Sequence, residues 1–165
     1  MRKLHQKKRA KTPVSRRQTS VSVSEESRTF TVVVPGDCQP RRVRIDAEPY
    51  IRILKRRCDY AIEVFHDPPK QVFFFVELKG GDVLKAVEQL AYTAEHLNDY
   101  KHLLDYRPFA LRHACIVASQ GLKPSITTRY QVWQARLTKC DFARVKVRTR
   151  QLTALVDEGG KVSYA

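Results

Sequence analysis

Two stretches in the middle of the chain have apolar patterns that are typical of β-strands. Residues 58–65 (CDYAIEVF) alternate, so that one face carries Tyr60, Ile62 and Val64. Residues 72–79 (VFFFVELK) form a nearly continuous apolar run, which is typical of a central strand covered on both sides. Between them, Pro68 and Pro69 cannot continue a ladder and predict a turn. The pattern therefore predicts a β-hairpin with a buried second strand.

The period then changes from two residues to that of a helix. Gly80-Gly81 ends the second strand, and Asp82 is a suitable N-cap for a long helix that we expect to run to about Leu104. Apolar residues step by four and three along it and predict its core stripe: Val83, Val87, Leu90, Ala94 and Leu97. A second stripe has the same spacing: Lys85, Gln89, Tyr92 and His96.

Further elements are predicted on both sides of this unit. Strands are expected at 29–34 and 42–46 before it and at 112–119 and 142–150 after it, and Ser125 is expected to cap a second helix. The core stripe expected for that second helix is Ile126, Tyr130, Trp133 and Leu137. This order of elements predicts an α/β domain with a mixed central β-sheet flanked by helices.

The net charge of +14 is unusual for 165 residues and favours polyanionic partners. Half of it lies in residues 1–28, where nine Lys or Arg stand against two Glu. Residues 1–27 hold few bulky apolar side chains and are expected to form a disordered basic tail, before a domain at 28–160. The tail suits nonspecific phosphate binding, a targeting signal or a flexible solubilising arm, and the sequence does not decide between these three roles.

Composition excludes several classes of protein. No apolar run approaches the length of about 18 residues that a membrane span needs. The four cysteines are scattered without a CxxC pair, which argues against a zinc site and favours reduced thiols in a cytoplasmic protein. The Arg- and Ser-rich start also overlaps with organellar transit peptides, so that alternative stays open.

Charged residues within the hairpin are the first candidates for chemistry. Asp59 stands in the first strand, and Glu77 and Lys79 share one face of the second. Burying them is costly unless they pair with one another or bind a metal. Two converging carboxylates suit Mg²⁺ or Mn²⁺, and a lysine on the same face can orient a water or neutralise charge at phosphorus. The alternative is a structural ion-pair network.

Asp59, seventeen intervening residues and then Glu77-Leu78-Lys79 resemble the motif of the PD-(D/E)XK nuclease superfamily. The resemblance implies a restriction-endonuclease-like fold, with the motif on a hairpin followed by a helix. It implies that Asp59, Glu77 and the Leu78 carbonyl bind Mg²⁺ or Mn²⁺, and that Lys79 is the catalytic lysine. Cys58 stands where the family name has proline.

Other residues extend this resemblance. Gln89 followed by Tyr92 resembles the motif on the next helix of RecB-like nucleases, which makes Gln89 a further candidate catalytic residue. An additional acidic metal ligand is found in many members, and Asp46 or Glu48 is the candidate here. The tripeptide Asp99-Tyr100-Lys101 also fits [DE]-x-K, but it falls in the predicted helix, where residues i and i+2 do not share a face.

The sequence therefore predicts a metal-dependent nuclease that cuts phosphodiester bonds, with DNA a better candidate than RNA and a homodimer possible. A non-catalytic basic nucleic-acid-binding module with the same fold is the alternative, and a partner-binding protein with a coincidental motif is a third. The expected nucleic-acid contacts are Lys85, Tyr92, Arg144, Lys146 and Arg148. The basic row 144–150 equally suits protection of an edge strand.

Overall fold

The computed structural model describes residues 18–47, 56–66, 70–105 and 110–165. Its helices are α1 (Val83–Glu95), α2 (Thr127–Lys139) and the short 3-10 segments η1 (Leu97–Tyr100) and η2 (Pro124–Ile126). Its strands are β1 (Gln18–Glu25), β2 (Arg28–Pro35), β3 (Gln39–Arg44), β4 (Tyr60–His66), β5 (Lys70–Lys79), β6 (Leu111–Ala118), β7 (Lys146–Thr149), β8 (Gln151–Val156) and β9 (Val162–Tyr164). The chain is thus a mixed α/β protein.

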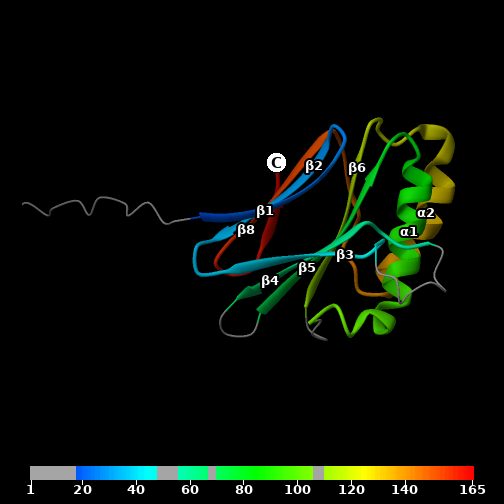
Figure 1. Cartoon of the computed structure of the whole chain (residues 1–165). Helices are drawn as coiled ribbons and strands as arrows, with labels where there is room; N and C mark the ends of the chain where they lie inside the picture. Colours follow the sequence, from blue (N-terminus) through cyan, green and yellow to red (C-terminus); the bar gives the residue numbers. More distant parts are fainter. Residues whose placement is uncertain (1–17, 48–55, 67–69, 106–109) are drawn as a thin grey trace, which may run out of the picture.

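The elements form three layers (Figure 1). A five-stranded sheet in the order β3-β4-β5-β6-β7 lies in the middle, and α1 and α2 cover one of its faces. A four-stranded sheet in the order β1-β2-β8-β9 covers the other face. Each interface has its own apolar core, so the central sheet is buried on both sides.

The predicted hairpin is confirmed and occupies the centre of the middle sheet. Strands β4 and β5 are antiparallel with Tyr60 opposite Val76, and β5 continues in parallel with β6. Alternate β5 side chains enter the two cores: Phe73 and Phe75 pack under the helices, and Phe74 packs against the second sheet. The turn predicted at residues 68 and 69 lies outside the described residues.

The prediction that helices flank the sheet on its faces was wrong for one face, which the second sheet covers. Two strands of this sheet, β8 and β9, were not predicted, although β8 alternates with Leu152, Ala154 and Val156 buried. Strand β1 lies inside the segment 1–27 that was expected to be disordered. It is short of apolar residues but pairs along its whole length with β2, which supplies the missing backbone partners. Residues 1–17 of that segment lie outside the described residues.

The first predicted helix is shorter than expected. Its cap is confirmed, because the Asp82 side chain accepts a hydrogen bond from the Lys85 N–H at 2.9 Å. The helix ends at Glu95 instead of Leu104, and η1 follows. This tighter turn carries Tyr100 into the core under the helices, where it is fully buried. Burial of this aromatic side chain is the physical reason for the early end.

Other boundaries also moved. The strand expected at 42–46 is β3 (Gln39–Arg44), and that expected at 142–150 is only Lys146–Thr149 in the middle sheet. Arg150 has a φ of 64°, which breaks the strand and starts the turn into β8. Ser125 is not a helix cap: η2 leads into α2, and the N-cap position is Ile126, without a side-chain hydrogen bond. None of the helices in the described part of the chain is long and apolar enough to cross a membrane.

Candidate active site

Asp59 and Glu77 meet where the β4–β5 hairpin ends. The register that pairs Tyr60 with Val76 places Asp59 opposite Glu77. The Asp59 N–H donates to Glu77 Oε2 at 3.1 Å, and the Leu78 N–H donates to Asp59 Oδ2 at 2.7 Å. Beyond Tyr60 and Val76, the last pair of the ladder, side-chain carboxylates accept these N–H groups in place of backbone carbonyls. The two acidic groups are thereby held beside each other.

Glu77 and Lys79 lie on the face of β5 that the helices cover. Leu78, between them, packs in the core against the second sheet, so its neighbours point the other way. Lys79 Nζ lies 3.4 Å from Glu77 Oε1. The Glu77 side chain is 0% exposed and that of Lys79 is 28% exposed, so the lysine links a buried acid to solvent.

Burial makes both carboxylates hard to ionise. It raises the pKa of Glu77 to about 8, and the neighbouring Asp59 charge adds to this while Lys79 opposes it. Burial also raises the pKa of Asp59 to about 6, although the Leu78 N–H stabilises the charged form. Glu77 Oε1 is buried and has no hydrogen-bond partner in the described part of the chain. The Lys79 ammonium, 3.4 Å away, is therefore the charged group that faces this oxygen.

Helix α1 positions the segment that leads into Asp59. The Gln89 side-chain amide donates to the Arg57 carbonyl at 2.9 Å. The buried Thr93 hydroxyl accepts from the Cys58 N–H at 2.8 Å and donates to the Gln89 carbonyl at 2.8 Å. Gln89 thus lies beside the site as expected, but its bond is to the backbone before Asp59. Sequence reasoning missed Thr93, whose signal is its spacing of four residues from Gln89.

Two further acids approach Asp59. Carboxylate oxygens of Glu25, Asp46 and Asp59 lie within 4.8 Å of one another. Asp46 was one of two candidates for an extra ligand, and the other, Glu48, lies outside the described residues. Glu25 was missed because it ends β1, in the stretch expected to be disordered. Arg44 offsets part of this charge, because its Nε donates to Asp46 Oδ1 at 2.8 Å.

Three groups at the hairpin end can bind a hard divalent cation. Two are the carboxylates of Asp59 and Glu77. The third is the Leu78 carbonyl: the N–H and C=O of one strand residue point to the same side, and the Leu78 N–H points at Asp59. Oxygen donors of this kind suit Mg²⁺ or Mn²⁺.

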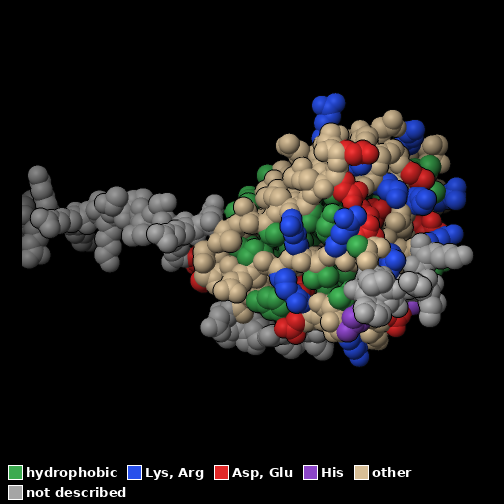
Figure 2. Space-filling model, viewed as in Figure 1, with side chains coloured by type: hydrophobic (Ala, Val, Ile, Leu, Met, Phe, Trp, Pro, Cys, Tyr) green, Lys and Arg blue, Asp and Glu red, His purple; other side chains and the backbone are tan. Residues whose placement is uncertain are grey.

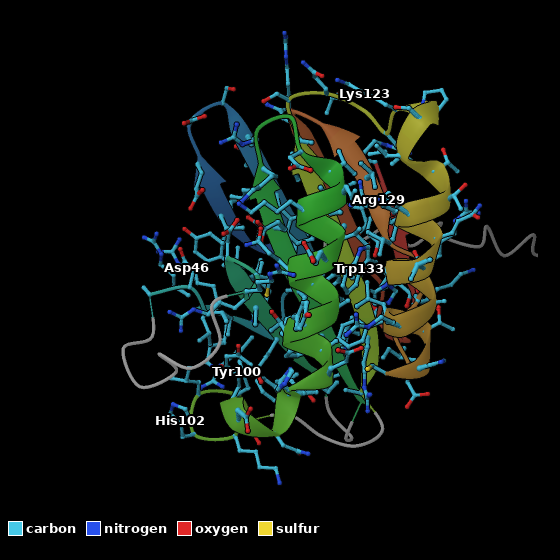
Figure 3. The ribbon with its side chains drawn as sticks, turned by 90° about the vertical axis from the view of Figure 1, so that its right-hand side faces the viewer. Asp46, Tyr100, His102, Lys123, Arg129 and Trp133 are labelled. Atoms are coloured by element: carbon cyan, nitrogen blue, oxygen red, sulfur yellow. The ribbon has the colours of Figure 1, made fainter. Side chains whose placement is uncertain are left out.

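A pocket of about 610 Å³ adjoins Lys79 and runs along the outer face of α1 toward α2. Its lining is Arg56, Lys79, Asp82, Leu84, Lys85, Glu88, Gln89, Arg129 and Trp133. Arg129 and Trp133 come from α2 and lie at the gap between the two helices (Figure 3). Lys85, a predicted nucleic-acid contact, therefore lies in the same pocket as Lys79 and Gln89.

Tyr92, the next predicted contact, packs among cations and rings. The Arg56 guanidinium lies 5.5 Å from its ring centroid, and that of Arg136 lies at 5.1 Å. The Trp133 ring centroid is 5.7 Å away. Tyr92 thus joins α1 to α2 next to the pocket.

The predicted basic row is not brought to the site. Lys146 and Arg148 alternate in β7 with Val147, which packs on the helix side, so they face the side of the second sheet. Lys146 Nζ lies 5.3 Å from the ring centroid of Tyr164, in β9. Arg144 precedes β7 and is exposed. Figure 2 shows Lys and Arg side chains over the helices, mixed with Asp and Glu.

The end of the hairpin thus combines two carboxylates with raised pKa values, a backbone carbonyl and a partly exposed lysine, beside a pocket lined by several Lys and Arg side chains. This arrangement can hold a divalent cation and receive an anionic oxygen next to it. Comparison of the chain with protein-family models, curated proteins and solved structures finds no match.

Proposed function

We propose that this protein is a metal-dependent nuclease of the PD-(D/E)XK superfamily, with a restriction-endonuclease-like fold, and that it hydrolyses phosphodiester bonds, with DNA as its substrate. The observation that carries the proposal is the convergence of Asp59, Glu77 and Lys79 at the end of one hairpin. The helix α1 follows directly, which is the order of elements that the sequence resemblance implies.

The donor set fits a divalent cation. Glu77 is fully buried, yet one of its oxygens has no hydrogen-bond partner in the described part of the chain, and its charge is stabilised there by the Lys79 ammonium and the Asp59 N–H. Burial raises the pKa of both Asp59 and Glu77, so the protein alone stabilises their charged forms poorly. A cation held by these carboxylates and the Leu78 carbonyl removes this cost.

When bound, Mg²⁺ or Mn²⁺ stabilises charge on a phosphoryl group and makes a coordinated water a better nucleophile. The chain supplies the remaining functions. Lys79, fixed beside Glu77 and partly exposed, can orient the attacking water or neutralise the charge that develops at phosphorus. Gln89 and Thr93 hold the backbone before Asp59 and so keep the carboxylate in place.

A non-catalytic nucleic-acid-binding module is the second candidate. Its support is the Glu77–Lys79 ion pair itself, because a pair that is already formed can serve the fold without any chemistry. The two proposals differ in cutting, not in binding.

The deciding experiment incubates the full chain with labelled single-stranded DNA, duplex DNA, branched DNA and RNA, in Mg²⁺, Mn²⁺ or EDTA. Cutting that requires the metal and is lost in Glu77→Ala and Lys79→Ala supports the nuclease. The chain offers a matched control in Lys101→Ala, since Asp99-Tyr100-Lys101 has the same spacing, but its two charged residues are exposed where η1 ends.

Lys101→Ala is expected to cut like the wild type. Cutting that survives Lys79→Ala and Glu77→Ala would assign the activity to another site or a contaminant. Binding by wild type and variants alike, without cutting of any of the four substrates, would leave the binding module.

A further inference from the structure

The pocket next to Lys79 has more positive charge than its own acids offset. Lys79 is paired with Glu77, and Arg56 is paired with Glu88 on α1. Asp82, the other acid in the lining, is occupied as the cap of α1. Lys85 and Arg129 remain, and neither forms an ion pair with an acid in the described part of the chain. Two cations that form no ion pair in that part of the chain, one on each of the two helices, thus border one pocket.

An aromatic ring lies beside these cations. Trp133 is one helical turn from Arg129 on α2, and both line the pocket (Figure 3). Its indole is only partly buried, although the apolar stripe of α2 predicts a core position. The Arg136 guanidinium lies 4.4 Å from the Trp133 ring centroid, and the Tyr92 ring centroid lies 5.7 Å from it. These two neighbours hold the indole in position. A partly buried indole in the same pocket as Lys85 and Arg129 is suited to a flat ligand with negative charge.

We infer that this pocket binds an unpaired nucleotide of the substrate strand, with its base against Trp133 and its phosphates near Lys85 and Arg129. The inference rests on the proposed nuclease function and narrows its substrate to nucleic acid with a single-stranded segment at the site. Lys79 lines the same pocket, so a strand lying in it passes next to the carboxylates.

Stacking chemistry favours a single strand over a duplex. A base within a duplex is covered on both faces by its neighbours, so it can contact an indole only after leaving the stack. The indole here lies in a pocket bordered by α1 and α2. Only a base that is already outside a stack can enter this pocket and contact the ring. An unpaired strand offers such bases at no unstacking cost and uses the same phosphate contacts.

Trp133 is the only tryptophan in the chain, so tryptophan emission, excited at wavelengths that tyrosine does not absorb, reports on this pocket alone. The experiment titrates the full chain, in EDTA to prevent cutting, with a twenty-nucleotide oligothymidylate and with a blunt duplex of equal length. Binding is followed by anisotropy of a labelled end and stacking by quenching of tryptophan emission. We expect the single strand to quench the emission and the duplex to leave it nearly unchanged.

Variants separate stacking from charge. Trp133→Ala is expected to weaken single-strand binding by roughly tenfold, and Trp133→Phe, which keeps a ring, by about threefold at most. Because Trp133 also touches the core, Arg129→Ala provides a second variant, expected to weaken binding by several-fold without loss of fold. Val132→Ala is the matched control: its side chain is 59% exposed on the same helix and does not line the pocket.

Each outcome addresses one statement. Binding of the single strand without quenching, or equal quenching by the duplex, overturns the inference while metal-dependent cutting can still establish the nuclease. Quenching by the single strand, with binding that is weaker in Arg129→Ala but not in Val132→Ala, supports the inference even if no substrate is cut. The absence of cutting would then contradict the proposed nuclease function alone.

Discussion

The Asp59 N–H donates a hydrogen bond to Glu77 Oε2 at 3.1 Å, so the backbone of one acidic residue holds the side chain of the other. The Leu78 N–H returns a bond to Asp59 Oδ2 at 2.7 Å. These two bonds fix two carboxylates side by side in a place where burial opposes their ionisation. The pair thus costs stability in the free protein and is suited to a bound cation.

Stability should fall with rising pH because of Glu77. Its pKa is about 8 in the folded chain and 4.5 when unperturbed, so between these values the folded state retains a proton that the unfolded state has released. Unfolding therefore becomes easier as the pH rises through this window. The Gln side chain of Glu77→Gln cannot ionise, so this variant should lose less free energy of unfolding than the wild type between pH 5 and 8. The expected difference is on the order of 2 kcal/mol, because each pKa unit is worth about 1.4 kcal/mol and relaxation of the protein around the charge reduces the total. Thermal melts in EDTA across this range measure it.

Glu95→Gln gives a contrast for this measurement. The Arg136 side chain lowers the pKa of Glu95, so its charged form contributes stability above its usual pKa and that contribution is lost in acid. This variant should therefore lose stability at pH 8, in the opposite direction to Glu77→Gln. A pH dependence of the melting temperature that Glu77→Gln leaves unchanged would contradict the assignment to Glu77.

Divalent cations should stabilise the protein at pH 8. Mg²⁺ or Mn²⁺ at about ten times its Kd adds about 1.4 kcal/mol, which is a few degrees in melting temperature for a chain of this size. Asp59→Asn and Glu77→Gln should remove the increase. Asp46→Asn should reduce it, because Asp46 lies within 4.8 Å of Asp59. Scanning fluorimetry with and without the metal provides the measurement.

Glu88→Gln serves as the control for metal binding, since Glu88 pairs with Arg56 on the outer side of α1. Its melting temperature should rise with the metal as in the wild type. An equal rise in all of these variants would place the cation elsewhere on the protein.

The pairing of Asp59 with Glu77 was accessible to sequence reasoning because it depends on local patterns. Alternation fixes which side chains share a face, and the hairpin fixes which residues are opposite each other. The Asp82 cap was accessible for the same reason, since it needs only the residues of the first helical turn.

What could not be predicted depends on contacts between distant segments. Strand β1 has few apolar residues, and it is a strand because β2 pairs with it, with Ser22 Oγ 2.8 Å from Thr31 Oγ1 across the pair. Glu25 reaches Asp59 only through this pairing. Trp133 follows the core spacing of α2, but the way α2 packs on α1 decides that the ring lines a pocket. Periodicity identifies a buried face without identifying its partner.

Thr93→Val should destabilise the protein although the two side chains have nearly the same shape. The substitution removes the acceptor of the Cys58 N–H and leaves a buried donor unpaired, at a cost of about 1–3 kcal/mol. Because Cys58 precedes Asp59, the cutting rate should also fall at temperatures where the variant remains folded. Thr93→Ser keeps the hydroxyl and should lose less of both. Urea unfolding and single-turnover cutting measure the two effects, and equal losses in both variants would refute the role of the hydroxyl.

Lys85 and Lys146 should differ in their effect on nucleic-acid binding because they lie on opposite sides of the middle sheet. Lys85 lines the pocket beside Lys79, whereas Lys146 lies over the Tyr164 ring on the side of the second sheet. Each phosphate contact contributes about 0.7–0.9 to the slope of log K against log salt. Lys85→Ala should therefore bind single-stranded DNA several-fold more weakly and lower the slope by about that amount, while Lys146→Ala should match the wild type. Anisotropy titrations at several salt concentrations decide this. A reduced slope in Lys146→Ala alone would move the phosphate-binding face from the helices to the edge strand β7.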